Sequence, residues 1–328
     1  MAQYIRDYHI RFLIEGNKTL DYTSVGQERP MHVKFKVGYG EKLSKLSLSI
    51  FNMSSESRKR IQSDDVKVRV QVGLRDTEKP GKIELKTLFL GSVNKDIFTT
   101  TSSADHETRI TAAEGYSLKE LKVNTSYPYG SSHTDVINDI CKQTAEASGG
   151  MITYDSSGID SLGITQKYKK GHTLSGVAEH LLDKLLITHN LKFKVAQGTL
   201  RITKQGRTPL SRIHKFNIQS GLLTAPKPIA QKNAQAQSNP LPTKGYRFKT
   251  ILSPEVIPES WVEVTDPITN EVLTLIVEKV RHTGAYEANE WYTEIEATLE
   301  AAEIQSNVIA ENKTKSTGIN YKSQFEGQ

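Results

Sequence analysis

The residues that could bind a metal ion or carry redox chemistry are few in this sequence. Cys141 is the only cysteine, which excludes an internal disulfide, and the chain contains neither a CxxC pair nor an HExxH stretch. Of the nine histidines, His172, His180 and His189 lie closest together, but the expected helix carries His180 while the other two flank it. We therefore expect no metal site and no cofactor, and we interpret Cys141 as a small buried apolar residue.

Acidic residues that could act in hydrolysis occur in two short stretches, AEH at 178–180 and EANEWYTEIE at 287–296. Glycoside hydrolysis needs two carboxyl groups that face one sugar, and nucleophilic catalysis needs a nucleophile beside a base. Both stretches instead follow the strand or helix spacing of a solvated face. The chain also lacks a G-x-S-x-G elbow and a glycine-rich phosphate loop. The sequence thus predicts a protein that is not an enzyme.

The charge balance admits an acidic partner without specifying one. The 328 residues include 43 Lys and Arg against 37 Asp and Glu, a formal net charge of +6. No basic block is longer than SRKR or KYKK, so a surface of mixed sign is favoured over a nucleic-acid site. No apolar run approaches the roughly 20 residues of a membrane helix. We expect a soluble protein, made in a cytoplasm and without stable membrane insertion.

Strict alternation of apolar and polar residues dominates residues 1–115. MHVKFKV places Val33, Phe35 and Val37 on one face and two lysines on the other, and KLSLSI and VKVRVQVG repeat the pattern. This alternation predicts an antiparallel barrel or sandwich of five or six strands. Between the last two stretches, SSESRKRIQSDD has serine caps, an early glutamate and later basic residues, which favour a short helix.

The period changes from 2 to 3.6 in residues 116–206. HTDVINDICKQTAEASGG and HTLSGVAEHLLDKLLITHN both have the apolar spacing of amphipathic helices, and the first ends on a glycine pair suited to a C-terminal cap. LKFKVAQGTLRITKQG follows as a hairpin that turns near Gln197 and Gly198. We expect a small inserted α+β module here.

Strands return in residues 207–300, which we interpret as a second barrel. Residues 207–240 include a mobile loop rich in Asn, Gln, Ala and Pro and could partly complete the first barrel, and residues 301–328 form a polar tail. Residues 66–115 and 260–300 share an order of strand, turn, strand, polar loop and closing strand, which suggests structural duplication. The predicted fold class is mostly β with an α+β insertion: two antiparallel β-barrel or sandwich domains plus the small module.

In this order, the segments resemble the baseplate hub proteins of tailed bacteriophages, a family related to type VI secretion spike proteins and to tail-tube proteins. The stretches that carry the resemblance are LSLSIFNMSSESRKRI, VKVRVQVGL, LFLGSV, SGLLTAPKP, ILSPEVIPESWVEV and VEKVRHTGAYEANEWYTEIEA. They span nearly the whole chain. The resemblance implies that their signature residues are structural, in cores and corners: Ile50, Phe51, Asn52, Gly73, Gly91, Gly221, Pro226, Pro258, His282, Gly284, Trp291 and Tyr292.

The resemblance also implies a function. Hub proteins are typically homotrimers with two tube-like barrels per chain, so three chains match a sixfold tail tube on one side and a threefold spike or fibre on the other. The expected partners are a tail tube or distal tail protein, a central spike, a tape-measure protein and other baseplate proteins. Phage DNA would pass through the lumen without sequence readout. The expected location is the virion baseplate, assembled in the bacterial host cytoplasm, with residues 301–328 as a candidate linker to the next component.

Two alternatives to a purely structural hub remain at this point. One is a carbohydrate-binding or peptidoglycan-binding tail protein, because KKGHTLSGVAEHLL has a LysM-like opening. The other is a wall-degrading tail enzyme. For the hub itself, lysines that line the lumen would impede DNA ejection, so we expect polar or weakly acidic residues to face inward and the lysine-rich faces to point outward.

Overall fold

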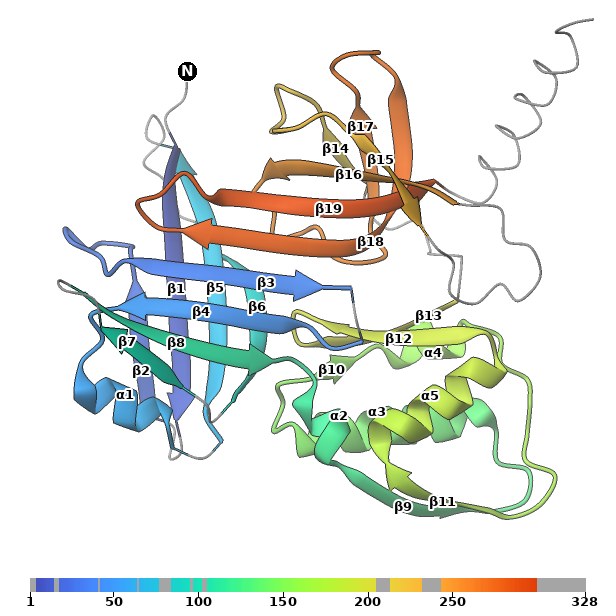
Figure 1. Cartoon of the computed structure of the whole chain (residues 1–328). Coiled ribbons are helices and arrows are strands. Elements are labelled where there is room, and N and C mark those ends of the chain that lie inside the picture. The colour runs from blue at the N-terminus through green and yellow to red at the C-terminus, as the bar shows by residue number, and fades with distance from the viewer. Residues whose placement is uncertain are drawn as a thin grey trace, which may run out of the picture.

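The structure is a computed structural model of the chain (Figure 1), and it describes residues 4–14, 18–40, 42–63, 65–76, 84–94, 97–101, 105–204, 213–231 and 243–299. The mobile loop expected within 207–240 falls mainly outside these residues, as does the tail at 301–328. No helix within the described ranges is long and apolar enough to cross a membrane.

The first part of the chain is built from strands and one short helix. Its elements are β1 (Tyr4–Ile14), β2 (Lys18–Thr23), β3 (Val33–Tyr39), β4 (Lys45–Phe51), α1 (Ser55–Ile61), β5 (Lys67–Asp76), β6 (Lys86–Val93), β7 (Phe98–Thr101) and β8 (His106–Ala113). Helix α1 begins where expected, because the Ser54 hydroxyl accepts the N–H of Ser57 at 3.1 Å. The described residues of this part form eight strands, more than the five or six that the sequence predicted. Strand β1 also alternates, with Tyr8, Ile10 and Phe12 fully buried, although charged residues separate them.

The last part of the chain contributes β14 (Ile213–Phe216), β15 (Lys227–Gln231), β16 (Thr243–Ile251), β17 (Trp261–Thr265), β18 (Val272–Ala285) and β19 (Trp291–Leu299). These strands and those of the first part form one 14-stranded sheet with the order β15-β16-β19-β18-β3-β4-β8-β6-β5-β1-β2. Strand β7 pairs with β8, β17 pairs with β18, and β14 pairs with β17. All these pairs are antiparallel except β14 with β17.

Strand β18 joins the two parts of the sheet. One of its edges pairs first with β17, over Val272–Ile276, and then with β3, over Val280–Ala285. The register towards β19 shifts between Val277 and Lys279, which marks a β-bulge where the two segments meet. Because of the bulge, one long strand can pair with β17 of the C-terminal half and with β3 of the N-terminal half.

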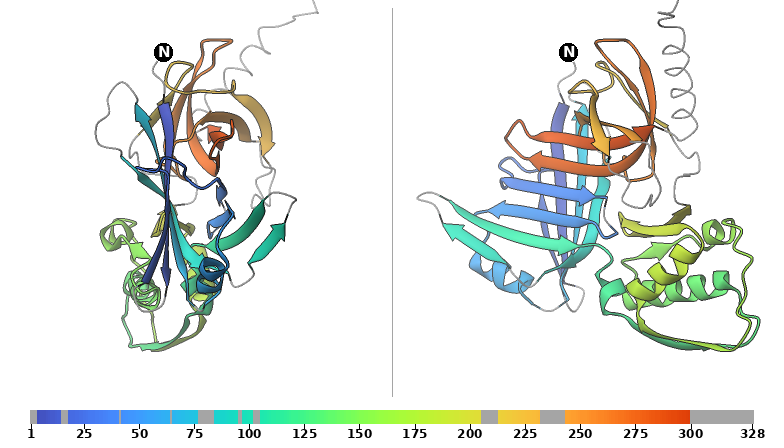
Figure 2. Two further views of the ribbon diagram at one scale, coloured as in Figure 1. Left: turned by 90° about the vertical axis from the view of Figure 1, so that its left-hand side faces the viewer. Right: turned by 45° about the vertical axis from the view of Figure 1, so that its right-hand side comes forward.

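The sheet folds back on itself to enclose the main core. Strands β6 and β8 share only two paired positions, and from there β6, β5, β1 and β2 run across the back of β3, β4 and β8 (Figures 1 and 2). The enclosed cluster combines buried residues from both halves, such as Phe12, Phe35, Phe89, Val277 and Trp291. Both halves therefore share one hydrophobic core.

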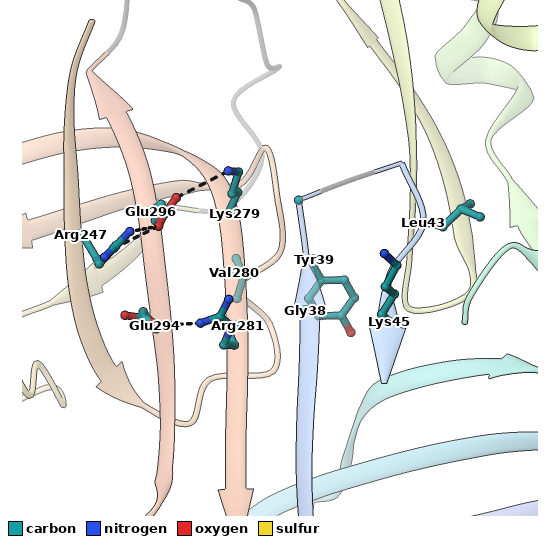
Figure 3. A pocket seen from close by; sticks show the side chains of 11 residues that line it. Gly38, Tyr39, Leu43, Lys45, Arg247, Lys279, Val280, Arg281, Glu294 and Glu296 are labelled. Carbon is teal, nitrogen blue, oxygen red and sulfur yellow. Dashed lines mark hydrogen bonds and ion pairs between the residues drawn. The ribbon is translucent and has the colours of Figure 1, made fainter. Parts of the chain in front are cut away.

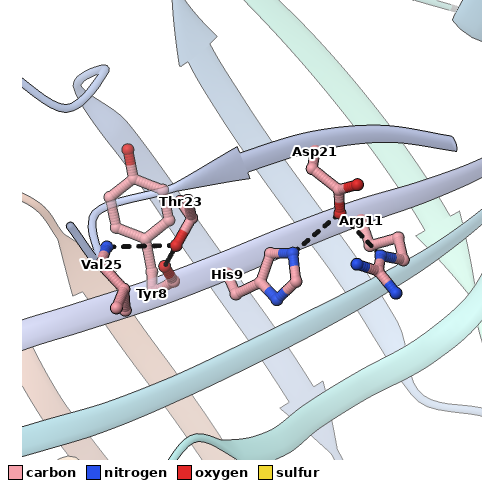
Figure 4. A network of polar contacts seen from close by, with 6 residues as sticks. All are labelled: Tyr8, His9, Arg11, Asp21, Thr23 and Val25. Carbon is pink, nitrogen blue, oxygen red and sulfur yellow. Dashed lines mark hydrogen bonds and ion pairs between the residues drawn. The ribbon is translucent and has the colours of Figure 1, made fainter. Parts of the chain in front are cut away.

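Polar contacts fix the β1–β2 hairpin on the far side of that core (Figure 4). The Asp21 carboxylate accepts from Arg11 Nε at 2.7 Å and lies 2.8 Å from His9 Nε2. Partial burial would raise the pKa of Asp21, but these two neighbours hold it below its usual value. Nearby, the Thr23 hydroxyl donates to the backbone oxygen of Tyr8 at 3.1 Å. These contacts tie β2 to β1.

Residues 116–204 form the inserted module. It comprises α2 (Tyr116–Glu120), β9 (Lys122–Tyr127), α3 (His133–Ala147), β10 (Thr153–Tyr154), α4 (Ser156–Asp160), β11 (His172–Val177), α5 (Ala178–Thr188), β12 (Leu191–Ala196) and β13 (Thr199–Lys204). Helix α3 begins with a capping box of Ser132 and Asp135. The module has a hydrophobic cluster of its own, which includes Ile137, Cys141 and Leu182. The predicted fold class, mostly β with a small α+β insertion, is confirmed.

Two sequence predictions for the module have different outcomes. The β12–β13 hairpin turns at Gln197 and Gly198, both with positive φ, as predicted. The second helix was expected to include Leu174, and this start was wrong. Residues His172–Val177 form β11 and pair with β9, and α5 begins only at Ala178. Leu174 lies on β11 with its side chain buried, so its apolar character is compatible with a strand as well as with a helix.

Candidate functional site

The strand end IFNMS is a corner of the sheet. Ile50 is fully buried, and Phe51 is half-buried. Asn52 has a left-handed backbone with φ of 56°, and its side chain holds the start of β8: Oδ1 accepts the N–H of His106 at 3.0 Å, and Nδ2 donates to Asp105 at 2.9 Å. These residues position two strands.

The signature glycines and prolines lie mainly at tight or buried positions. A Cβ atom at Gly91 would lie 2.5 Å from the backbone oxygen of Ala113, and one at Gly284 would lie 2.1 Å from the Phe35 ring. Larger residues at these two sites would therefore displace a neighbour. The remaining positions are Gly73 in β5, Gly221 in the turn before β15, and the buried Pro226 and Pro258.

The remaining signature residues divide between the two faces of the β18–β19 pair. His282 is fully buried with Nδ1 2.9 Å from the Thr293 hydroxyl, and burial lowers its pKa to about 3. Trp291 packs edge to face against Phe35 in the core. Tyr292 lies on the opposite face, where the Lys249 ammonium sits 4.4 Å from its ring centroid.

Histidines from three segments of the module meet, but they are not the three that lie closest in sequence. His133 Nδ1 lies 2.8 Å from His189 Nε2, and the Tyr168 ring packs against both His133 and His172. His180 is exposed on α5. Burial and the other imidazoles lower the pKa of His133. No group of three or more potential metal ligands occurs in the part of the chain that the structure describes.

Buried polar residues fix the module to the sheet. Glu114, directly after β8, is fully buried; its backbone N–H donates to Ser44 and its carboxyl oxygen accepts the N–H of Leu90 at 2.9 Å. Ser44 in turn donates to the backbone oxygen of Val195 in β12 at 2.6 Å. Burial raises the pKa of Glu114 to about 8 despite these donors, so its carboxyl group is held neutral at neutral pH.

A second contact comes from the C-terminal half. Glu259 has a left-handed backbone with φ of 71°, and its carboxylate lies 2.8 Å from Lys192 Nζ and 3.5 Å from Lys194 Nζ, both on β12. Burial would raise the pKa of Glu259, but the two lysines bring it below its usual value. The module is thus attached to both halves of the sheet.

The most distinctive surface is the face of the sheet that points away from the core. Figure 2 (left) shows that β15 and β16 at one end and β7 at the other bend towards the side away from β1, so this face is concave. We define the concave face as the outward residues of β15, β16, β19, β18, β3, β4, β8 and β7. The charged residues that strand pairing places on this face are three acids, Glu107, Glu294 and Glu296, and nine bases: Lys34, Lys36, Lys45, Arg109, Lys227, Arg247, Lys249, Lys279 and Arg281. Glu278 lies in the bulge of β18 without a paired position and is not counted.

Cross-strand pairs order part of the concave face (Figure 3). Arg247 lies 2.5 Å from the Glu296 carboxylate, and Lys279 lies 3.9 Å from the same group. Arg281 pairs with Glu294 at 3.6 Å. A cavity of about 350 Å³ opens between these residues and a second group on the other side: Gly38, Tyr39, Gly40, Leu43 and Lys45. Two of the carboxylates in 287–296 that the sequence offered for hydrolysis, Glu294 and Glu296, are thus engaged in ion pairs on this face.

Sequence analysis did not single out the concave face. The signal was present in the polar positions of the alternating strands, such as Lys34 and Lys36, but no strand adds more than two cations. The face forms only because β18 and β3, about 240 residues apart in sequence, pair side by side.

No model of a known protein family matches the sequence, and no curated protein matches it either. Solved structures do match in fold. A tail protein from Neisseria meningitidis MC58 has a TM-score of 0.55 at 8% identity, with 89% of this chain and 96% of that chain covered. The 43 kDa tail protein of prophage MuSo2 from Shewanella oneidensis has a TM-score of 0.51 at 9% identity, with 89% and 98% covered.

A third similar structure comes from a secretion system. It is an E. coli component of the type VI secretion system that exhibits structural similarity to the T4 bacteriophage tail proteins gp27 and gp5. Its TM-score is 0.51 at 9% identity, with 84% of this chain and 75% of that chain covered. The resemblance to tail proteins is therefore confirmed at the level of the fold: this chain has the fold that phage tail proteins share with type VI secretion components.

Proposed function

We propose that this protein is a structural hub of a phage tail baseplate, which closes the tail tube and forms part of the channel for DNA. The observation that carries the proposal is the curved run of eight strands behind the concave face. Four of them, β3, β4, β7 and β8, come from the N-terminal half, and four, β15, β16, β18 and β19, come from the C-terminal half. One chain thus supplies two four-stranded units side by side.

The two ends of this run suggest how copies join. Among the described strands, β7 pairs only with β8 and β15 pairs only with β16, so each has one edge without a strand partner. Pairing of β7 in one chain with β15 in the next would be a head-to-tail contact, which closes into a ring if the rotation fits. Three chains would give six four-stranded units around a hole, with threefold symmetry overall.

This arrangement suggests which side of the ring each partner protein would bind. Six similar units would face a sixfold tail tube or distal tail protein on one side, and the threefold side would hold a central spike or fibre. Other baseplate proteins and a tape-measure protein are further proposed partners. The fold similarity to phage tail proteins supports a location in the virion, with assembly in the bacterial host cytoplasm.

The edge contact can be tested with charge at the proposed joint. Phe98 on β7 is 67% exposed, and Phe98→Lys would place a charge at that edge. Ile268, at the turn between β17 and β18, is 81% exposed and away from both edges, so Ile268→Lys is the matched control. Light scattering should give the mass of three chains for the wild type and for Ile268→Lys, and one chain for Phe98→Lys. Equal masses for both variants would refute the edge contact.

A second candidate function is glycan binding by the module. It is favoured by Tyr129, which is 78% exposed, because exposed aromatic rings can pack against sugars. Retention of the full chain on peptidoglycan, and its loss in Tyr129→Ala, would support this candidate. Absence of retention would remove it.

A further inference from the structure

We propose that the concave face binds the phosphate backbone of double-stranded DNA directly and without reading its sequence. The proposal rests on the channel role above for the source of the DNA. The binding itself follows from the charge, accessibility and composition of the concave face.

The concave face concentrates the positive charge of the molecule. Its nine bases and three acids leave an excess of six positive charges, which equals the formal net charge of +6 for the whole chain. The rest of the chain is therefore balanced between acids and bases. A surface with such an excess of positive charge attracts a polyanion and speeds its association.

The cations of the concave face remain available although some are paired. The side chains of Lys279 and Arg281 are each 66% exposed, and that of Arg247 is 50% exposed. Exposed ion pairs contribute only about 0–1 kcal/mol each, so a phosphate can replace a carboxylate at little cost. Neighbouring strands place such side chains about 4.8 Å apart across the sheet. DNA presents a comparably dense row of phosphates, about one charge per 1.7 Å of helix axis.

The composition of the concave face favours DNA over an acidic protein. A stable protein interface has an apolar centre that is depleted in charge. The middle of the concave face instead carries Thr111, Ser47, Lys36 and Thr283, in register across β8, β4, β3 and β18. DNA needs no apolar centre, because phosphate contacts supply essentially all of its sequence-independent affinity. A concave sheet also follows the surface of a cylinder.

If the concave face lines the hole of the ring, the expectation of a polar or weakly acidic lumen is reversed. That expectation was based only on the argument that lysines in the lumen would slow the passage of DNA. The basic concave face would instead hold DNA within the hub through many weak, exchangeable contacts.

The test compares two sets of three charge removals in the full chain. The concave-face set neutralises three lysines of that face: Lys36→Gln, Lys45→Gln and Lys279→Gln. The helix set is the control, and it removes the same charge from exposed positions on α1, α3 and α5: Lys59→Gln, Lys142→Gln and Lys184→Gln. Binding to labelled duplex DNA of random sequence is followed by fluorescence anisotropy over a series of salt concentrations, with poly-glutamate of matched charge as competitor.

Wild-type protein should bind DNA with an affinity that falls steeply as salt rises. The concave-face set should weaken binding about tenfold or more at low salt and reduce the logarithmic salt slope by about 2–3, while the helix set should leave both nearly unchanged. Equal losses in the two sets, or no salt-dependent binding, would overturn the proposal. Displacement of DNA by poly-glutamate at equal charge would overturn it in favour of an acidic protein partner.

The same samples separate this proposal from the hub role. Light scattering reports the number of chains in each variant, and none of the six substitutions lies on β7 or β15. DNA binding by a protein that forms no ring would uphold the present proposal and count against the hub. A ring that does not bind DNA would support the hub role and overturn the present proposal.

Discussion

Single residues hold the halves of this sheet together, and Gly284 illustrates how. It lies in β18 opposite Phe35 of β3, and the ring occupies the space that a Cβ atom would need. The sequence identified Gly284, His282 and Trp291 through the family resemblance, but not the neighbours that make them necessary. Those neighbours lie on strands distant in sequence, so alternation alone could assign a residue to a face but could not name its contacts.

Gly284→Ala should destabilise the fold by about 1–3 kcal/mol, because the new methyl group would force the buried Phe35 ring to move. Chemical denaturation measures the free energy of unfolding. Gly38→Ala on β3 is the control, since nothing lies within 4 Å of its Cβ position, and it should be neutral or slightly stabilising. Equal effects of the two substitutions would disprove the packing argument.

Glu114 predicts a pH dependence of stability. Its pKa is raised to about 8 in the folded chain from an ordinary value of 4.5, so between these values the unfolded chain loses a proton that the folded chain keeps. This group therefore makes stability fall as pH rises through that window, by up to about 1.4 kcal/mol per pH unit.

Glu114→Gln should remove this fall, so that urea unfolding at pH 5 and pH 8 gives more similar stabilities than in the wild type. Glu107→Gln, on the exposed side of β8, should keep the wild-type fall, because the pKa of Glu107 is lowered by Arg109 and Ser49 and not raised. An unchanged pH dependence in Glu114→Gln would show that other groups cause it.

At the scale of elements, local signals were reliable where an element is defined by its own residues. Helices α1 and α3 and the β12–β13 turn follow from caps, periodicity and a Gln-Gly pair. The start of α5 was misplaced because the partner of β11 is β9, about 50 residues earlier. Tertiary pairing there outweighed a helical pattern that local sequence supports.

The ion pairs of Glu259 should control how firmly the module docks. Glu259→Gln would leave Lys192 and Lys194 without their carboxylate, which should weaken the local stability of β12 by roughly 1–3 kcal/mol. Hydrogen exchange of the β12 amides measures this opening. Glu263→Gln, which breaks the more exposed pair with Lys215, should leave β12 unchanged. Faster exchange in both variants would argue against a specific role for Glu259.

At the scale of the whole molecule, the distribution of charge could not be read from the sequence. A net charge of +6 without a basic block was interpreted as a surface of mixed sign. The strands instead gather nine bases on one concave face, because β16, β18, β3, β4 and β8 are spread along the chain but adjacent in the sheet. By contrast, the alternation of apolar and polar residues predicted the β-rich class, and the family resemblance of the ordered segments predicted the tail-protein fold.

The central claim is that this curved sheet continues from chain to chain around a hole. An electron cryo-microscopy map of the purified assembly tests it most directly. The account predicts a threefold ring in which β7 of each chain pairs with β15 of the next and the concave face lines the hole. A map in which those two edges remain unpaired, or in which the concave face lies on the outside, would contradict it.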